Sequence, residues 1–464
     1  MTSSVPPAEA RVERLPWQGD PLDLLRRAAG RQHPFLLLSG GPPGRWTVMG
    51  WEPFHVWTPA PGEDPFRALA ALAARTPVHP CPPLPFVGGL VGFLGYECLR
   101  FVEDVPVREP GELPMAWFAA YGAALVHDGS SGELHAVATG WPEAGGAARA
   151  RRAARQLEAM RRLAAGTPTA VAGAVGAGTG LRSSLPRPAY LRAVGRILEH
   201  IRRGDIHQAN LTQRIVLDLP EPAPIPTFCR LQRCSRAPHA AFLDGGTWQL
   251  LSASPERFVA LVGDEAESRP IKGTIRRGPD PRRDRELREA LRGSPKDRAE
   301  NVMIVDLVRN DLHRVCVPGT VHVPALAEAE TYATLHHLVS TVRGRLAPSH
   351  GVADLLRALF PPGSMTGAPK IRAMEILHRL EPVARGPYAG GLGYLSFDGR
   401  LDLSVVIRTI LLQGSTARFH VGGGVVAESE PESEYEESLL KARALLQVLG
   451  GDAAVAGEPA PSHP

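Results

Sequence analysis

The stretch QLLSASPERFVALVGDEAESRPIKGTIR (residues 249–276) decides the class of fold. Its apolar runs have the length of strands, and the polar segment VGDEAES (262–268) separates them, a pattern that predicts successive antiparallel strands. Working outward, similar runs occur at QRIVLDL (213–219) and RTILLQG (408–414), whereas 295–309 and 431–449 have the length and apolar spacing of long helices. The sequence therefore predicts an α+β fold with sizeable sheets.

Composition limits the classes of function. Hydrophobic residues make up 44% of the 464 residues and charged residues 22%, which suffices for a globular core. The formal net charge is +4 and the arginines are scattered, so we expect no nucleic acid partner. Five cysteines without a CxxC pair argue against a disulfide framework or a zinc site and fit a reducing cytoplasm. Because no signal peptide pattern and no run of eighteen apolar residues occurs, we expect a cytoplasmic protein with no membrane contact.

A change of composition divides the chain. The segment AAGTPTAVAGAVGAGTG (164–180) consists of small residues and prolines and follows an Arg- and Ala-rich helical pattern, so it is interpreted as a linker. The predicted organisation is an N-terminal region, a linker, a catalytic domain and a disordered tail, at 1–165, 166–184, 185–450 and 451–464.

Glu256 and Lys272 are the first candidate pair for catalysis. They are sixteen residues apart on what look like two successive strands, so both side chains can face one side. A buried lysine becomes a nucleophile when desolvation lowers its pKa, and a glutamate in the same cleft can carry a proton. From the pattern alone, an exposed salt bridge between strands is the commoner explanation.

Two acidic pairs at i, i+3 suggest a metal site. Asp297 with Glu300, and Glu434 with Glu437, each share one face of a predicted helix. If both faces met at one cavity, their four carboxylates would suit Mg²⁺, which takes oxygen ligands. Taken singly, each pair is also typical of acidic residues that complement the positive end of a helix.

Glycines and one arginine complete the pattern. The run Gly422, Gly423, Gly424 joins two strands and either cradles an anion with backbone N–H groups or forms a tight turn. PPGSMTGAPK (361–370) places small residues before a helix start, which is weak evidence for an anion site. Arg408, within an apolar strand, needs either a structural carboxylate or an acidic ligand.

In this order, these segments resemble the chorismate-utilising enzymes: anthranilate synthases, aminodeoxychorismate synthases, and isochorismate and salicylate synthases. The resemblance extends over about residues 185 to 448 and is fainter before them. The stretches that carry it are GDIHQANLTQRI, SPERF, RPIKGT, DRAENVMIVDLVRNDL, HHLVSTVRG, PPGSMTGAPKIRAMEIL, GGLGYLSFDG, VVIRTI and GGGVVAESEPESEYEESLLKA. The family fold implied is α+β, with two intertwined parts, large antiparallel sheets packed as a sandwich, and helices outside.

Three positions separate the branches of this family. Isochorismate and salicylate synthases have a lysine that activates water where this chain has Gln208, and a neutral amide cannot serve as that base. Anthranilate synthases carry alanine in PIAGT, whereas this chain has Lys272 in PIKGT, as aminodeoxychorismate synthases do. The loop GSMTGAPK is similar to their GSITGAPK. The resemblance therefore implies conversion of chorismate and ammonia to 4-amino-4-deoxychorismate, on the route to 4-aminobenzoate and folate.

The resemblance also implies roles for particular residues. Lys272 would be the nucleophile and Glu256 the proton donor, and Mg²⁺ would be held by Glu300 and Glu437, with Asp297 and Glu434 acting directly or through water. Asp297 stands where several relatives have glutamate, so it would reach the metal through water. The residues implied for substrate binding are Gln208, Thr274, His337, Tyr394, Arg408, Gly422, Gly423 and Gly424.

Partners follow from the same resemblance. The chain contains no cysteine nucleophile elbow of the amidotransferase kind, so a separate glutamine amidotransferase small subunit is implied, as a heterodimer that supplies ammonia. A tryptophan pocket is implied near Ser39, Pro43, Gly44, Arg45, Trp46, Pro238, His239 and Ala240. Because the loop PHA differs from the NPSPYM of feedback-regulated anthranilate synthases, we expect a structural tryptophan or an empty pocket. The alternatives are an anthranilate synthase large subunit and a non-catalytic homologue that only binds a partner.

Overall fold

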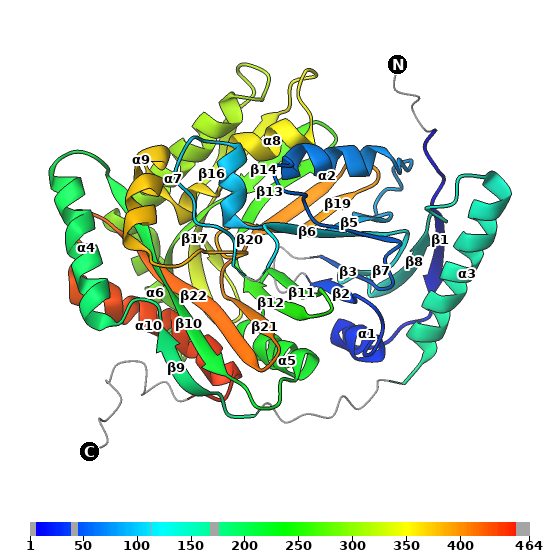
Figure 1. Cartoon of the computed structure of the whole chain (residues 1–464), viewed down its shortest axis with the longest axis horizontal. Coiled ribbons are helices and arrows are strands. Elements are labelled where there is room, and N and C mark those ends of the chain that lie inside the picture. The colour runs from blue at the N-terminus through cyan, green and yellow to red at the C-terminus, as the bar shows by residue number, and fades with distance from the viewer. Residues whose placement is uncertain (1–5, 39–44, 112, 168–175, 452–464) are drawn as a thin grey trace.

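Two large antiparallel sheets, with helices around them, form the molecule (Figure 1). The structure is a computed structural model and describes residues 6–38, 45–111, 113–167 and 176–451. Predicted positions at 39–44 and at 452–464 therefore lie outside the described residues.

The first sheet has twelve strands. In spatial order they are β1 (Arg11–Leu15), β8 (Glu133–Ala138), β7 (Ala123–Asp128), β3 (Trp46–Gly50), β2 (Phe35–Leu38), β11 (His239–Asp244), β12 (Trp248–Ser254), β21 (Thr409–Gln413), β22 (Thr416–Val425), β10 (Gln208–Asp218) and β18 (Gly367–Ala368), with β9 (Thr179–Ser183) also paired to β10. Residues 179–183 of the predicted linker are thus a strand.

The second sheet has ten strands. In spatial order they are β15 (Ile271–Arg276), β17 (Leu335–Arg345), β14 (Glu265–Arg269), β13 (Arg257–Val262), β20 (Leu401–Val405), β19 (Gly391–Ser396), β5 (Gly89–Leu94), β6 (Ala116–Tyr121) and β4 (His55–Trp57), with β16 (His322–Thr331) also paired to β17. Strands from before residue 165 therefore lie in both sheets. β2 pairs with β11, and β5 pairs with β19, so the two predicted parts are intertwined.

Helices surround the sheets, as the predicted α+β class requires. They are α1 (Pro21–Arg27), α2 (Pro65–Ala74), α3 (Gly146–Ala165), α4 (Arg187–Arg202), α5 (Pro224–Ser235), α6 (Pro281–Gly293), α7 (Pro295–His313), α8 (Val352–Leu359), α9 (Lys370–Leu380) and α10 (Pro431–Val448), with short 3₁₀ turns η1 (Tyr96–Phe101) and η2 (Gly363–Met365). α4 and α10 lie beside each other at one end of the view, with α3 at the other end (Figure 1). The helices predicted at 295–309 and 431–449 are confirmed as α7 and α10.

The core lies mainly between the sheets. Phe35 of the first sheet and Phe93 and Phe118 of the second are fully buried in one apolar cluster. A second cluster joins the other face of the first sheet to α1, α3, α5 and α10, and includes Phe228 and Leu445. Burial on both faces anchors the first sheet, so side chains at its edge near β10 and β22 are held in fixed positions.

Candidate active site

Lys272 lies on β15, at the edge of the second sheet, with its amine largely enclosed. The side chain is 12% exposed, and Nζ is 3.8 Å from Oε2 of Glu300 on α7. Burial lowers the pKa of the Lys272 amine and Lys441 lowers it further, against the opposing carboxylates of Glu300, Glu256 and Glu437. The amine is therefore more easily deprotonated than an exposed lysine, as a nucleophile requires.

Glu256 lies where the chain crosses from the first sheet to the second. It follows β12 and precedes β13, and its backbone is fixed because its carbonyl accepts the N–H of Val405 at 3.0 Å. The residue is 5% exposed. Burial raises the pKa of its carboxyl to about 7, although the Ser364 hydroxyl and the Lys272 amine oppose the rise. The carboxyl can therefore hold or release a proton near neutrality.

The strand geometry behind this pair differs from the prediction. The polar turn VGDEAES does join two antiparallel strands, β13 and β14. Lys272, however, lies one strand further on, after Pro270, and β15 pairs with β17 rather than with β13. The sequence could not show this step, because Pro270 ends one strand and permits a second to begin at once.

The four candidate metal ligands lie on the first turns of α7 and α10. Ser294 caps α7 by accepting the N–H of Asp297 at 3.3 Å, and Glu300 faces Lys272 from the next turn. On α10, Glu434 is buried and accepts from the Ser429 hydroxyl at 2.6 Å. α7 thus presents Glu300 to Lys272 of β15, and α10 presents Glu434 and Glu437 to Gly423 of β22.

Their charges are balanced by lysines. Glu437 Oε1 is 2.7 Å from Lys441 Nζ, which also donates to the carbonyl of Gly422 at 2.9 Å. Burial raises the pKa of the Glu437 carboxyl, but the Lys441 ammonium more than offsets this, and the net pKa lies below the ordinary value.

Within the described part of the chain, no three His, Cys, Asp or Glu side chains lie close enough to hold a metal. The donor chemistry suits a hard cation, but the ligands are not gathered into a finished cluster.

The glycine run is part of a strand. Gly422, Gly423 and Gly424 belong to β22 and pair with β10, so they neither join two strands nor form the alternative tight turn. A Cβ on Gly424 would lie 2.4 Å from Gln208 Nε2 and 3.1 Å from Lys272 Nζ, and one on Gly423 would lie 3.0 Å from Glu434 Oε2. The absence of side chains therefore lets the lysine approach one face of the strand and the acidic helix the other.

Gln208 and Arg408 have spare hydrogen-bonding capacity, whereas Thr274 and His337 contact each other. Both amide atoms of Gln208 are buried without a hydrogen-bond partner among the described residues. Thr274 Oγ1 is 2.8 Å from Nδ1 of His337, and burial, with the Arg408 charge, lowers the pKa of His337 to about 3, so this ring is neutral. Burial lowers the pKa of Arg408, and in the described part of the chain no carboxylate pairs with it. Of the two explanations for this arginine, the structure favours an acidic ligand.

Tyr394 is not at this site. It pairs with Asp402 in the register of β19 and β20, and its ring packs edge-on against Phe86 at 5.4 Å. Its side chain lines a separate cavity of about 610 Å³ between the sheets. Strand register turns the Tyr394 side chain toward this cavity, so the structure does not bring it together with Lys272 and Glu256.

The same cavity contains the predicted tryptophan pocket. Its lining includes all five predicted residues that the structure describes, namely Arg45, Trp46, Pro238, His239 and Ala240, whereas Ser39, Pro43 and Gly44 lie outside the described residues. Strands β2, β3 and β11 of the first sheet face β13, β14, β19 and β20 of the second across it.

Two residues near the glycine strand were missed. Lys441 sits at i+4 from Glu437, a spacing typical of an exposed ion pair. Composition could have drawn attention to Lys441. The sequence has four lysines among 52 Lys and Arg residues, and one of the other three is Lys272. Tyr388 is buried, and its ring stacks on His420 of β22 at 5.0 Å. It precedes Tyr394 by six residues in one motif, and only the folded register separates them.

An enclosed amine beside a glycine-rich strand, a carboxyl that titrates near neutrality and a guanidinium without a carboxylate partner among the described residues are the groups expected of an enzyme for a small acidic substrate. The family model described as chorismate binding enzyme matches residues 33–447. The chain belongs to this family of chorismate-binding enzymes.

Individual relatives agree with this assignment. Aminodeoxychorismate synthase component 1 of Klebsiella aerogenes is 41% identical over 373 residues, which cover 80% of this chain and 79% of that protein. Anthranilate synthase component 1 of Streptomyces coelicolor is 39% identical over 424 residues, covering 89% and 82%. The crystal structure of anthranilate synthase component I from Streptococcus pneumoniae TIGR4 superposes with a TM-score of 0.75 at 28% identity, covering 87% of this chain and 92% of that one. In the described part of the chain, no helix is long and apolar enough to cross a bilayer.

Proposed function

We propose that this chain is the large subunit of an aminodeoxychorismate synthase, which converts chorismate and ammonia to 4-amino-4-deoxychorismate. The observation that carries the proposal is the enclosed amine of Lys272, 3.8 Å from Glu300 and beside the proton-carrying Glu256. An amine in this place offers a nucleophile that an anthranilate synthase, with alanine there, lacks. Relatives with both names match this chain at similar identity, so this one residue has the most weight.

The proposed chemistry consists of two displacements. The Lys272 lone pair forms a bond to C2 of chorismate, both ring double bonds shift, and the C4–O bond breaks as Glu256 gives its proton to the leaving hydroxyl, which departs as water. Ammonia then bonds to C4, the double bonds shift back, and the C2–N bond breaks with return of its electron pair to Lys272. Two such shifts place the new amine at C4.

The other residues bind and orient the substrate. Thr274 and Gly423 would contact the ring carboxylate, and Arg408, Gly422 and Gly424 the enolpyruvyl carboxylate. The neutral ring of His337 lies 2.8 Å from Thr274 and would stand near the leaving hydroxyl, with the spare amide of Gln208 opposite Gly424.

Mg²⁺ is part of this proposal. The residues that would hold it are Glu300 and Glu437, with Asp297 and Glu434 directly or through water. A Cβ at Gly423 would lie 3.0 Å from Glu434 Oε2, so glycine lets the α10 carboxylates lie close to the strand. When bound, Mg²⁺ neutralises the ring carboxylate and helps to orient the ring.

A separate subunit would supply the ammonia. Relatives are named component 1, which fits a second component, and we propose a glutamine amidotransferase that forms a heterodimer with this chain. The product retains its enolpyruvyl group, so a lyase must remove pyruvate to give 4-aminobenzoate for folate synthesis.

Mass spectrometry of the product tests the function. The protein is incubated with chorismate, Mg²⁺ and an ammonium salt, with and without an added lyase. We expect a product that keeps the enolpyruvyl group until the lyase is added. Direct release of fluorescent anthranilate would instead assign the chain to the anthranilate synthases, and no consumption of chorismate would favour a non-catalytic homologue.

We also propose that the cavity between the sheets binds tryptophan without feedback inhibition. Its lining combines the aromatic rings of Trp46 and Tyr394 with Arg257, which is paired with Asp402. An aromatic amino acid presents matching apolar and charged groups. Calorimetry with tryptophan should give a saturable heat while turnover stays unchanged; a flat titration would indicate an empty pocket, and inhibited turnover would show regulation.

A further inference from the structure

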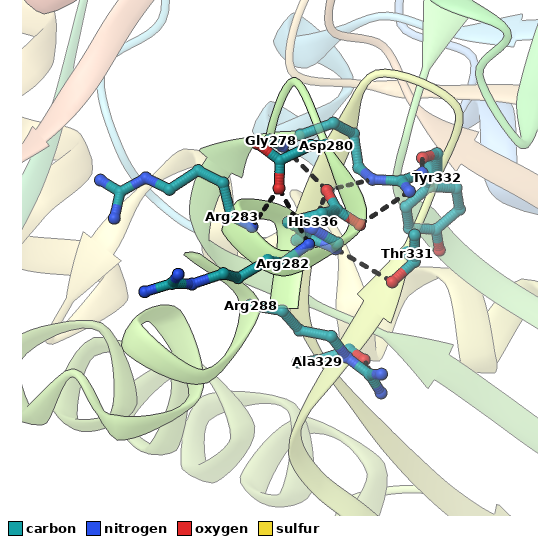
Figure 2. A network of polar contacts seen from close by, with 11 residues as sticks. Gly278, Asp280, Arg282, Arg283, Arg288, Ala329, Thr331, Tyr332 and His336 are labelled. Atoms are coloured by element: carbon teal, nitrogen blue, oxygen red, sulfur yellow. Dashed lines mark hydrogen bonds and ion pairs between the residues drawn. The ribbon is translucent and has the colours of Figure 1, made fainter. Parts of the chain in front are cut away.

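A polar network lies at the start of α6, and its labelled members include Gly278, Thr331 and His336 (Figure 2). Asp284 Oδ1 accepts from Arg277 Nε at 2.6 Å, from the N–H of Gly278 at 2.8 Å and from His336 Nε2 at 3.0 Å, and Oδ2 accepts from Arg277 Nη2 at 2.8 Å. One carboxylate thus joins α6 to the end of β15, through Arg277, and to β17, through His336. The Arg277 guanidinium holds the pKa of the Asp284 carboxyl well below its usual range.

The α6 helix depends on such polar contacts for its position. Leu291 is its only buried residue, and most of its other side chains are charged. Besides Asp284, Arg288 donates to the carbonyl of Ala329 on β16 at 3.2 Å. A helix with so little apolar burial is located by its hydrogen bonds and ion pairs rather than by the core.

The network reaches His337 by two routes. His336 is the preceding residue on β17, and its buried ring lies between Asp284 and Thr331. Thr331 Oγ1 is 2.9 Å from Nδ1 of His336. Arg277 Nη1 donates to the carbonyl of Tyr332 at 3.0 Å, and the Tyr332 ring packs edge-on against the His337 ring at 5.4 Å. His337 in turn contacts Thr274, its partner in the register of β15 and β17.

We infer that Asp284 is a positioning residue for the substrate carboxylate: it locks α6 onto the ends of β15 and β17 and so fixes the pair formed by Thr274 and His337. The inference rests on the proposed function, because that pair is assigned to chorismate there. Asp284 itself touches no part of the proposed substrate site. Its effect is on the placement of Thr274 and His337, and the expected loss is mainly one of substrate binding through Thr274.

The test compares Asp284→Asn with a matched control, Asp280→Ala. Asp280 caps the same helix by accepting the N–H groups of Arg282 and Arg283 at 3.0 and 2.9 Å. The control therefore weakens α6 without touching Arg277 or His336. We expect Asp284→Asn to raise KM for chorismate about tenfold with kcat within about threefold, because a misplaced binding group costs ground-state affinity. The control should stay within about twofold of wild type.

A second readout does not depend on turnover. The imidazole ¹⁵N shifts of His337, assigned with His337→Gln, should change in Asp284→Asn and remain unchanged in Asp280→Ala. If Asp284→Asn does not fold, Arg277→Lys is measured in its place. This variant loses the paired contact with Asp284 and the contact with the Tyr332 carbonyl, so KM for chorismate should rise about threefold.

Two outcomes overturn the inference. One is an equal rise of KM in the Asp284 and Asp280 variants, which would show that the network only stabilises the helix. The other is a KM within about twofold of wild type in Asp284→Asn, or in Arg277→Lys where that variant replaces it. KM is taken from the disappearance of chorismate and is checked by calorimetric binding. If the product proves to be anthranilate, the proposed function fails while this comparison remains valid.

Discussion

At the scale of single residues, the amine of Lys272 is the group whose removal has the clearest consequence. Lys272→Ala takes away the atom that would bond to C2, while the surrounding sheet is unchanged. We expect turnover to fall by at least about 10³-fold, because no neighbouring group can replace the nucleophile. Arg276→Ala is the matched control, since Arg276 is an exposed residue of the same strand. Product formation by Lys272→Ala at a wild-type rate would refute covalent catalysis.

The pH dependence also belongs to this scale. Glu256 must be protonated to release the hydroxyl, and its pKa is raised to about 7 by burial, so kcat/KM should fall above that pH by about tenfold per unit. Lys272 must be neutral to act as the nucleophile, and its pKa is lowered. On the acid side of the profile, kcat/KM should therefore rise with pH as the amine loses its proton. The expected profile is bell-shaped. Glu256→Gln should remove the upper limb and lower kcat by about 10²-fold or more; a variant with an unchanged profile would exclude Glu256 as the donor.

Residue identities could be predicted from the sequence only where local spacing was enough. Lys272, Glu256 and Arg408 carry their chemistry in short motifs, and the structure brings Glu256 to Lys272 and Arg408 to His337. Tyr394 and Tyr388 share one motif, and the side of the sheet that each faces depends on pairing with strands far away in sequence.

At the scale of elements, α10 contributes its first turns to the proposed metal site. Glu437→Gln removes one charged oxygen ligand, so the Mg²⁺ concentration for half-maximal activity should rise by at least about tenfold. Glu436→Gln is the control, because Glu436 is an exposed neighbour on the same helix. The measurement is a metal titration of chorismate consumption. Identical titrations for the two variants would remove Glu437 from the site.

Helices were easier to predict than strands for a physical reason. The periodicity and caps of α7 and α10 are local, so their ends could be predicted to within a few residues. The glycine run resembles a turn locally, and it becomes the end of β22 because β10 supplies the partner hydrogen bonds. Likewise, the break at Pro270 gives no sign that β15 will pair with β17.

At the scale of the whole molecule, the two predicted parts cannot be separated along the chain. The pattern predicted sheets, but the order of their strands follows from contacts between segments some 200 or more residues apart, for which a single sequence has no local signal. β2 and β5, from the first hundred residues, lie inside the two sheets rather than at their ends. The boundary near residue 165 is therefore a change of composition and not a border between two cores.

A fragment of residues 185–450 tests this view. Without the N-terminal strands, β11 loses its pairing with β2, and β19 loses its pairing with β5, so a strand edge opens in each sheet beside apolar surface of the shared core. Open edges of this kind promote aggregation. We expect the fragment to elute as aggregates and to show no cooperative thermal unfolding by circular dichroism, whereas the full chain should elute as a folded protein and unfold cooperatively. Co-expression of residues 1–184 should restore a folded complex and chorismate consumption, because the missing strands can pair from a separate chain. A fragment that is monomeric and unfolds cooperatively by itself would show that the catalytic half has a core of its own.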